Sequence, residues 1–175
     1  MGWNRKHCSF AFLCATFLIM IVASCRISYK FNGSSIDYTK IKTISIQDFP
    51  NRAPLVYPTL ATDFTENLRD EFSSKTSLKM VDMDGDLQIS GEISGYNVIS
   101  SGVDASGEAS ESRLQMSVRV KFVNKVNSSE DFEKTFSAYE VFSNQYTIDQ
   151  VQAELNEQLM DDIINQIFNA TVANW

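Results

Sequence analysis

The most constraining feature of this chain is a strict alternation over residues 113–122. Apolar side chains take every second position: Leu114, Met116, Val118, Val120 and Phe122. The positions between them are polar and include three basic residues: Arg113, Arg119 and Lys121. Because successive side chains of a strand point to opposite faces, this pattern predicts a strand with one buried and one polar face. A fold built on it needs a covering layer on one side only.

Three further segments are typical of strands. Residues 41–46 alternate and end before Pro50, and residues 87–95 alternate between apolar or glycine positions and polar ones. Residues 132–141 alternate more weakly, because Lys134 falls on the parity of the phenylalanines around it, and a β-bulge there would restore the pattern. Residues 100–112 are rich in serine, glycine and acidic residues, which predicts a long flexible hairpin loop.

Two segments predict amphipathic helices. After Pro58, apolar side chains recur every four residues, at Leu60, Phe64, Leu68 and Phe72. The second helix begins at Thr147, which fits a capping box with Gln150, and its apolar positions continue to about Ala170. The element order is then β-α-β-β-β-α. Since each element has one apolar side, we expect an α+β two-layer sandwich, with two helices packed on one face of a four-stranded, mostly antiparallel sheet.

The first 25 residues are typical of a secretory signal that ends at a lipid attachment site. Arg5 and Lys6 precede an apolar run over residues 10–22, which is shorter than the about 20 residues of a membrane-spanning helix. The run ends in Val22-Ala23-Ser24-Cys25, a bacterial lipobox pattern. We expect a signal peptide over residues 1–24, a lipidated tether over residues 25–39 that begins at the acylated Cys25, and a folded domain over residues 40–175. The alternative is a plain signal peptide cut nearby, with Cys25 as a free thiol.

Removal of residues 1–24 leaves a mature chain with no histidine and with Cys25 as its one cysteine. This composition excludes Cys–His nucleophiles, Ser–His–Asp triads and His/Cys metal sites in the mature chain. Against 22 acidic residues the mature chain keeps 13 basic ones, a balance that disfavours nucleic acid as a partner. We therefore expect a non-enzymatic protein with no cofactor and no metal.

The acidic turn Asp82-Met83-Asp84-Gly85-Asp86 invites a calcium interpretation. An EF-hand loop requires glycine at its sixth position and a bidentate glutamate at its twelfth. Here Gly85 is fourth and Ile93 is twelfth. A turn between a helix and a strand also explains the aspartates and the glycine, and we favour that interpretation.

Arg113, Arg119 and Lys121, here named the basic row, fall on the polar face of one predicted strand. One interpretation is a site for the phosphate or carboxylate groups of an anionic lipid, because arginine forms bidentate bonds with phosphate. The other is ordinary pairing with Glu92 or Glu133 on neighbouring strands. The sequence leaves both interpretations open.

Several segments together resemble a known family. They are the lipobox, Ile46-Gln-Asp-Phe49-Pro-Asn51, Pro58-Thr-Leu60, Gly85-Asp86-Leu87, Arg113-Leu114 through Phe122-Val-Asn124, and Ile167-Phe168-Asn169 with the terminal Val172-Ala-Asn174-Trp175. Over residues 41–175 the chain is similar to the LptE-like lipoproteins of the Bacteroides group. The LptE family has two helices on a four-stranded sheet, which matches the order given above.

The resemblance implies a lipoprotein that partners and plugs the outer-membrane β-barrel LptD and assists lipopolysaccharide insertion into the outer leaflet. The basic row is then the candidate lipopolysaccharide contact. Because no acidic run follows Arg26, similarity to known sorting rules implies an outer-membrane anchor, with the domain facing the periplasm or inside a barrel lumen. Two alternatives stay open: another outer-membrane lipoprotein that serves as a binding or assembly module unrelated to lipopolysaccharide transport, and a lipid-anchored enzyme that uses carboxylates.

Overall fold

Five strands and two helices make up most of the computed structural model, which describes residues 36–100 and 111–172. The elements are β1 Thr43–Ile46, α2 Leu60–Lys75, β2 Lys79–Met80, β3 Leu87–Ser100, β4 Glu111–Asn124, the 3-10 turn η1 Ser128–Glu130, β5 Phe132–Ser143 and α3 Ile148–Thr171. The expected signal peptide, Cys25 and residues 101–110 of the expected loop lie outside the described residues.

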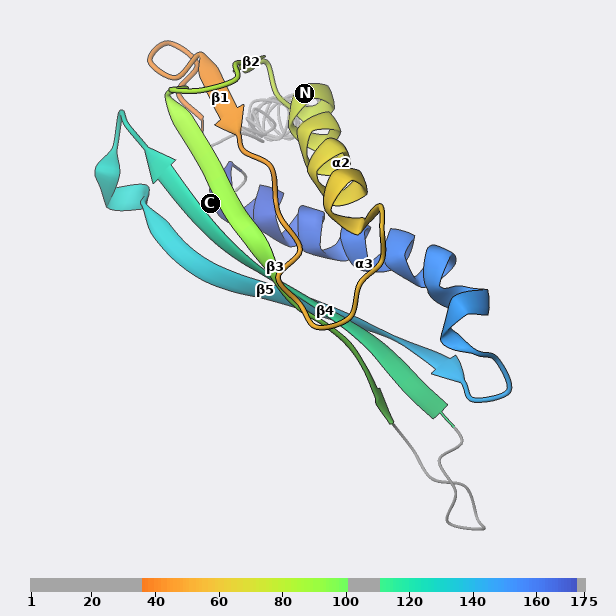
Figure 1. Cartoon of the computed structure of the whole chain (residues 1–175). Coiled ribbons are helices and arrows are strands. Elements are labelled where there is room, and N and C mark those ends of the chain that lie inside the picture. Colours follow the sequence, from red (N-terminus) through yellow and green to blue (C-terminus); the bar gives the residue numbers. More distant parts are fainter. Residues whose placement is uncertain (1–35, 101–110, 173–175) are drawn as a thin grey trace, which may run out of the picture. The chain divides into compact units, whose positions relative to one another are not determined.

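The strands form a single mixed sheet in the order β2-β1-β3-β4-β5 (Figure 1). The long strands β3, β4 and β5 are antiparallel, whereas β1 runs parallel to both β2 and β3. The expected α+β fold is confirmed, but the sheet has five strands where the sequence predicted four. The extra strand, β2, is two residues long, which is too short to show a period of two.

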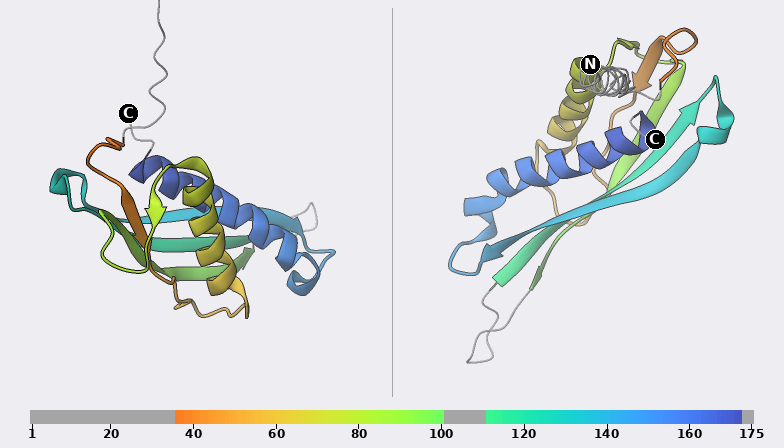
Figure 2. Two further views of the ribbon diagram at one scale, coloured as in Figure 1. Left: turned by 90° about the horizontal axis from the view of Figure 1, so that it is seen from above. Right: turned by 180° about the vertical axis from the view of Figure 1, so that it is seen from behind.

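Both helices cover the same face of the sheet (Figure 2). Their apolar sides and one face of the sheet form a continuous core, in which the Phe72 and Phe168 ring centroids are 5.1 Å apart and join α2 to α3. The predicted capping box of α3 is confirmed: the Thr147 N–H donates to Gln150 Oε1 over 2.9 Å. The periodicity of the sequence thus identified both helices and the sides they bury.

A β-bulge lies in β3 and not in β5. The β3–β4 register passes from Ile93 opposite Val118 to Gly95 opposite Ser117, which leaves Ser94 as the extra residue. The bulge reverses the parity of β3, so that Tyr96 is fully buried. The β4–β5 register is continuous, and the predicted bulge near Lys134 is therefore wrong.

Lys134 keeps its place on the helix side of β5 because β5 is an edge strand of the sheet. There its side chain is exposed, with Nζ 5.0 Å from the Phe136 ring centroid. A lysine that points inward on an edge strand also discourages pairing with another chain. The strands are longer than predicted as well, since Ser100, Glu111 and Ser112 of the expected 100–112 loop belong to β3 and β4.

A buried polar link ties β3 to α3 within this core. The Tyr96 hydroxyl donates to Asn156 Oδ1 over 2.7 Å and accepts from Gln152 Nε2 over 2.8 Å. Burial raises the pKa of Tyr96 above its ordinary value. The link fixes the register of α3 against the sheet, because both amide side chains meet the one hydroxyl.

Candidate functional site

The face of the sheet opposite the two helices is polar and is the candidate functional surface. In Figure 1 both helices lie on one side of the sheet, and in the view from above in Figure 2 they lie over the strands, so this face is turned away from the viewer there. On β4, Arg119 and Lys121 are exposed and Arg113 is half-buried, whereas the alternate positions from Leu114 to Phe122 are buried. The predicted outward orientation of the basic row is therefore confirmed, while its role stays a prediction.

The residues of the basic row differ in the acidic side chains that lie next to them. Arg119 Nη1 lies 3.2 Å from Glu92 Oε1, and the two side chains are 54% and 33% exposed. Lys121 lies directly across from Glu133 on β5. The cross-strand interpretation thus holds for Arg119, and such an exposed pair contributes at most about 1 kcal/mol to stability. Lys125, just beyond the row, forms an ion pair with Asp84 instead.

Arg113 stands apart from the other two basic residues. Its cross-strand neighbours are Ile99 on β3 and Val141 on β5, neither of which carries charge. Its guanidinium carbon lies 5.3 Å from the centroid of the Tyr139 ring, a cation–π contact. Its Nε–H is buried and has no hydrogen-bond partner among residues 36–100 and 111–172. Six residues along β4, about 20 Å, separate Arg113 from Arg119.

Sequence reasoning missed Tyr139 and Val141 as members of this surface. Both lie on the polar face of β5, and they are 57% and 44% exposed. The parity of β5 placed them on the outer face, but their position beside Arg113 depends on the β4–β5 register. That register is set by the η1 connection, whose geometry has no clear sequence signature.

Two carboxylates of the acidic turn already bind backbone and side-chain groups of the protein. Asp86 Oδ2 accepts the backbone N–H groups of Lys42 and Thr43 over 2.8 and 2.9 Å, and these bonds lower the pKa of Asp86. Asp84, at φ 66°, pairs with Lys125, which lowers the pKa of Asp84. In the residues that the structure describes, no group of three or more His, Cys, Asp or Glu side chains is placed to hold a metal ion. The turn interpretation accounts for these contacts.

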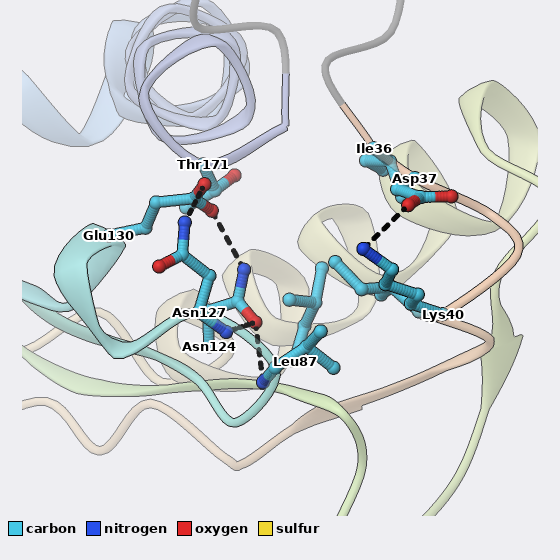
Figure 3. A pocket seen from close by; sticks show the side chains of 10 residues that line it. Ile36, Asp37, Lys40, Leu87, Asn124, Asn127, Glu130 and Thr171 are labelled. Carbon is cyan, nitrogen blue, oxygen red and sulfur yellow. Dashed lines mark hydrogen bonds and ion pairs between the residues drawn. The ribbon is translucent and has the colours of Figure 1, made fainter.

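A cavity of about 280 Å³ lies at the end of the sheet away from Arg113. At this end β3 begins and the described chain starts at Ile36 (Figure 3). Glu130 points to two asparagines there, and its carboxylate accepts from Asn124 Nδ2 over 2.7 Å and from Asn127 Nδ2 over 2.8 Å. Asp131 accepts the Asn124 N–H over 2.7 Å. These bonds close the β4–β5 turn, so the polar groups of the cavity already serve a structural purpose.

No helix among residues 36–100 and 111–172 is long and apolar enough to cross a membrane. The fold and the surface together define a two-layer α+β sandwich domain in which neither helix covers the second face of the sheet.

The sequence model of the LptE family, described as "Lipopolysaccharide-assembly", matches residues 41–171, about three quarters of the chain. The chain therefore belongs to the LptE family. The match covers all the described strands and helices and confirms the family that the sequence resembled.

Solved structures show the same fold at low sequence identity. The hypothetical protein CT253 from Chlamydia trachomatis has a TM-score of 0.53 at 10% identity, over 75% of this chain and 98% of that chain. The rare lipoprotein B from Shewanella oneidensis has a TM-score of 0.51 at 11% identity, over 74% of this chain and 90% of that chain. No curated protein matches the chain significantly.

Proposed function

We propose that this chain is an outer-membrane lipoprotein that partners and plugs an LptD-like β-barrel and assists lipopolysaccharide insertion into the outer leaflet. The observation that carries the proposal is the LptE family match over residues 41–171, which spans the folded domain. In this proposal residues 1–24 are a cleaved signal peptide, Cys25 is acylated, and residues 25–39 tether the domain over residues 40–175. The domain faces the periplasm or lies within the barrel lumen.

The surface chemistry of the domain supports this role. The interior of a wide outer-membrane barrel is polar, so a protein that fills it must present polar side chains. Here both helices turn their apolar sides to the sheet, and the uncovered face of the sheet carries hydroxyl and charged groups, among them Ser117, whose Oγ is 2.8 Å from Ser137 Oγ. The domain acts by binding, and it needs no catalytic group for this work.

The basic row is the proposed contact for the phosphate groups of lipopolysaccharide. Arginine and lysine keep their charge at physiological pH, so this binding weakens with salt more than with pH. Replacement of Arg113, Arg119 and Lys121 together by serine is expected to reduce lipopolysaccharide binding at least tenfold, since each charged hydrogen bond contributes about 1.5–3 kcal/mol. The unfolding midpoint in urea stays close to that of the wild type, because all three side chains lie outside the core.

The partnership is tested by purification of the intact lipoprotein from its native membrane with a mild detergent. A large β-barrel, identified by mass spectrometry, is expected in a fixed ratio to the lipoprotein. A Cys25→Ala chain serves as the control for association through the shared membrane alone. Recovery of the lipoprotein without any barrel would contradict the proposal and favour a binding or assembly module outside lipopolysaccharide transport.

A further inference from the structure

The three members of the basic row have different electrostatic surroundings. Arg119 is neutralised by Glu92 at 3.2 Å, and Lys121 faces Glu133 across the sheet. Arg113 has no ion pair among the residues that the structure describes, and both of its cross-strand neighbours are aliphatic. Its positive charge is therefore the least compensated of the three.

The surroundings of Arg113 are also the most apolar part of the open face. Tyr139 and Val141 on β5 are 57% and 44% exposed, and Ile99, on the other side of Arg113 on β3, is half-buried. Neighbouring apolar side chains on an otherwise polar face form a candidate contact for an apolar group of a ligand. A cation set within them is matched by a ligand that is anionic at one end and apolar at the other.

The buried Nε–H of Arg113 strengthens this interpretation. A buried donor without an acceptor is costly, and arginine presents Nε and one Nη as a fork that fits two oxygens of a phosphate. The Tyr139 ring centroid is 5.3 Å from the guanidinium carbon, and among the described residues the Nε–H has no acceptor. An external oxygen that reaches this edge after a small movement of the side chain would satisfy the donor.

We propose that Arg113, Tyr139 and Val141 form an amphiphile site, in which Arg113 binds the phosphate of a phosphorylated lipid and the two β5 side chains contact the first part of its apolar chain. This inference rests on the proposed function for the choice of a phosphorylated glycolipid as ligand. It goes further in assigning unequal roles within the basic row: Arg113 binds the ligand, and Arg119 stabilises the sheet through Glu92.

The test compares two substitutions that remove the same charge from the same face of the same strand. Binding of lipid A to the intact lipoprotein is followed by native mass spectrometry in a nonionic detergent, so that the lipid anchor is common to every variant. Arg113→Gln is expected to weaken binding about tenfold or more, and Arg119→Gln less than about threefold. Equal losses in the two variants would overturn the inference, because they would indicate a diffuse charge effect.

Two further variants examine the geometry of the site. Arg113→Lys keeps the charge but loses the planar fork and the stacking on Tyr139, so it is expected to recover only part of the affinity. Tyr139→Ser removes the aromatic support without a change in charge and is expected to weaken binding several-fold. Full affinity in both variants would contradict the site. A urea unfolding midpoint equal to that of the wild type shows that each variant is folded.

The ligand itself is varied to identify which chemistry is bound. Lipid A from which the phosphates have been removed should bind weakly, and equally to the wild type and Arg113→Gln. Inorganic phosphate should not displace lipid A at concentrations comparable to the lipid, and efficient displacement would indicate a plain phosphate site and overturn the amphiphile assignment. If the barrel co-purifies with Arg113→Gln as with the wild type, the partnership stands whatever the lipid result.

Discussion

Asp86 offers the sharpest test of the structure, because a single carboxylate oxygen holds two backbone N–H groups. Asp86 Oδ2 accepts from the N–H groups of Lys42 and Thr43, so it ties the start of β1 to the start of β3. Asp86→Ala leaves both donors without this acceptor. Hydrogen bonds to a charged group contribute about 1.5–3 kcal/mol each, and partial exposure of Asp86 lowers this, so the loss is about 2–3 kcal/mol in total.

Asp86→Asn separates the geometry from the charge. Its amide oxygen can occupy the position of Oδ2 and accept both bonds, so we expect a loss of only about 1 kcal/mol. The free energy of unfolding is measured by urea titration for the wild type and both variants. A loss below about 0.5 kcal/mol for Asp86→Ala would refute the assigned role. An increase in stability on addition of calcium to the wild type would instead favour the metal interpretation of the acidic turn.

The same bonds predict a pH dependence of known sign. They lower the pKa of Asp86 in the folded state below the value of about 3.9 for an unfolded chain. The stabilisation by the charged carboxylate is then complete above the unfolded pKa and is lost as the pH falls through the lower folded pKa. The difference in stability between the wild type and Asp86→Asn should therefore shrink in acid, and a difference that does not vary with pH would contradict this linkage.

Three other perturbations have expected outcomes. Gly91→Ala places a methyl group against the Arg119 carbonyl oxygen and 2.6 Å from Phe49 Cε1, so it should destabilise the fold by about 3 kcal/mol or more in urea titration, whereas Gly95→Ala, which meets Ser117 Cβ at 3.2 Å, should cost less than about 1 kcal/mol. Tyr96→Phe removes the hydroxyl between Gln152 and Asn156 and should cost about 1–3 kcal/mol by the same measurement. Cys25→Ala should leave the chain unprocessed or soluble after membrane fractionation, and an unchanged mass and membrane fraction would exclude lipidation there.

The strand β4 shows how much sequence alone can establish. Its alternation from Arg113 to Phe122 predicted both the strand and its buried face, because a central strand covered on one side leaves no other arrangement of these side chains. Helix α3 was predicted equally well, because its capping box and its apolar positions both indicate the same first residues. Local periodicity and burial specify the same structure in these elements.

The errors have a common physical cause. The apparent conflict at Lys134 arises from an edge position, where a lysine on the inner face reaches solvent past the sheet, and edge position depends on strand order. The bulge at Ser94 was hidden because Gly95, small and without a side chain to bury, fits either parity. Both the edge position of Lys134 and the bulge at Ser94 depend on which distant segments pair as strands. The local pattern of a single sequence does not reveal this pairing.

The candidate site depends on such pairing in the same way. Strand parity put Arg113 on the open face, but the Tyr139 ring beside it and the aliphatic neighbours across the sheet follow from the registers of β3 and β5. From the sequence alone, the three basic residues were therefore predicted to be equivalent. In the structure they differ in their cross-strand neighbours, which are aliphatic for Arg113 and acidic for Arg119 and Lys121.

The described chain starts at one end of the sheet, and Arg113 lies near the other end. Ile36 and Ile41 line the same cavity as Leu87, so the described chain enters beside the start of β3. From Leu87 the strand runs twelve residues to Ile99, which faces Arg113, a distance of about 40 Å at about 3.3 Å per residue. If Cys25 is acylated as proposed, the tether joins the domain near Ile36. The length of β3 then places the amphiphile site at a distance from Ile36 that is most of the about 40–45 Å thickness of a bilayer with its headgroups. A domain of this length can therefore remain attached at one membrane surface and still bind a lipid phosphate far from its own point of attachment.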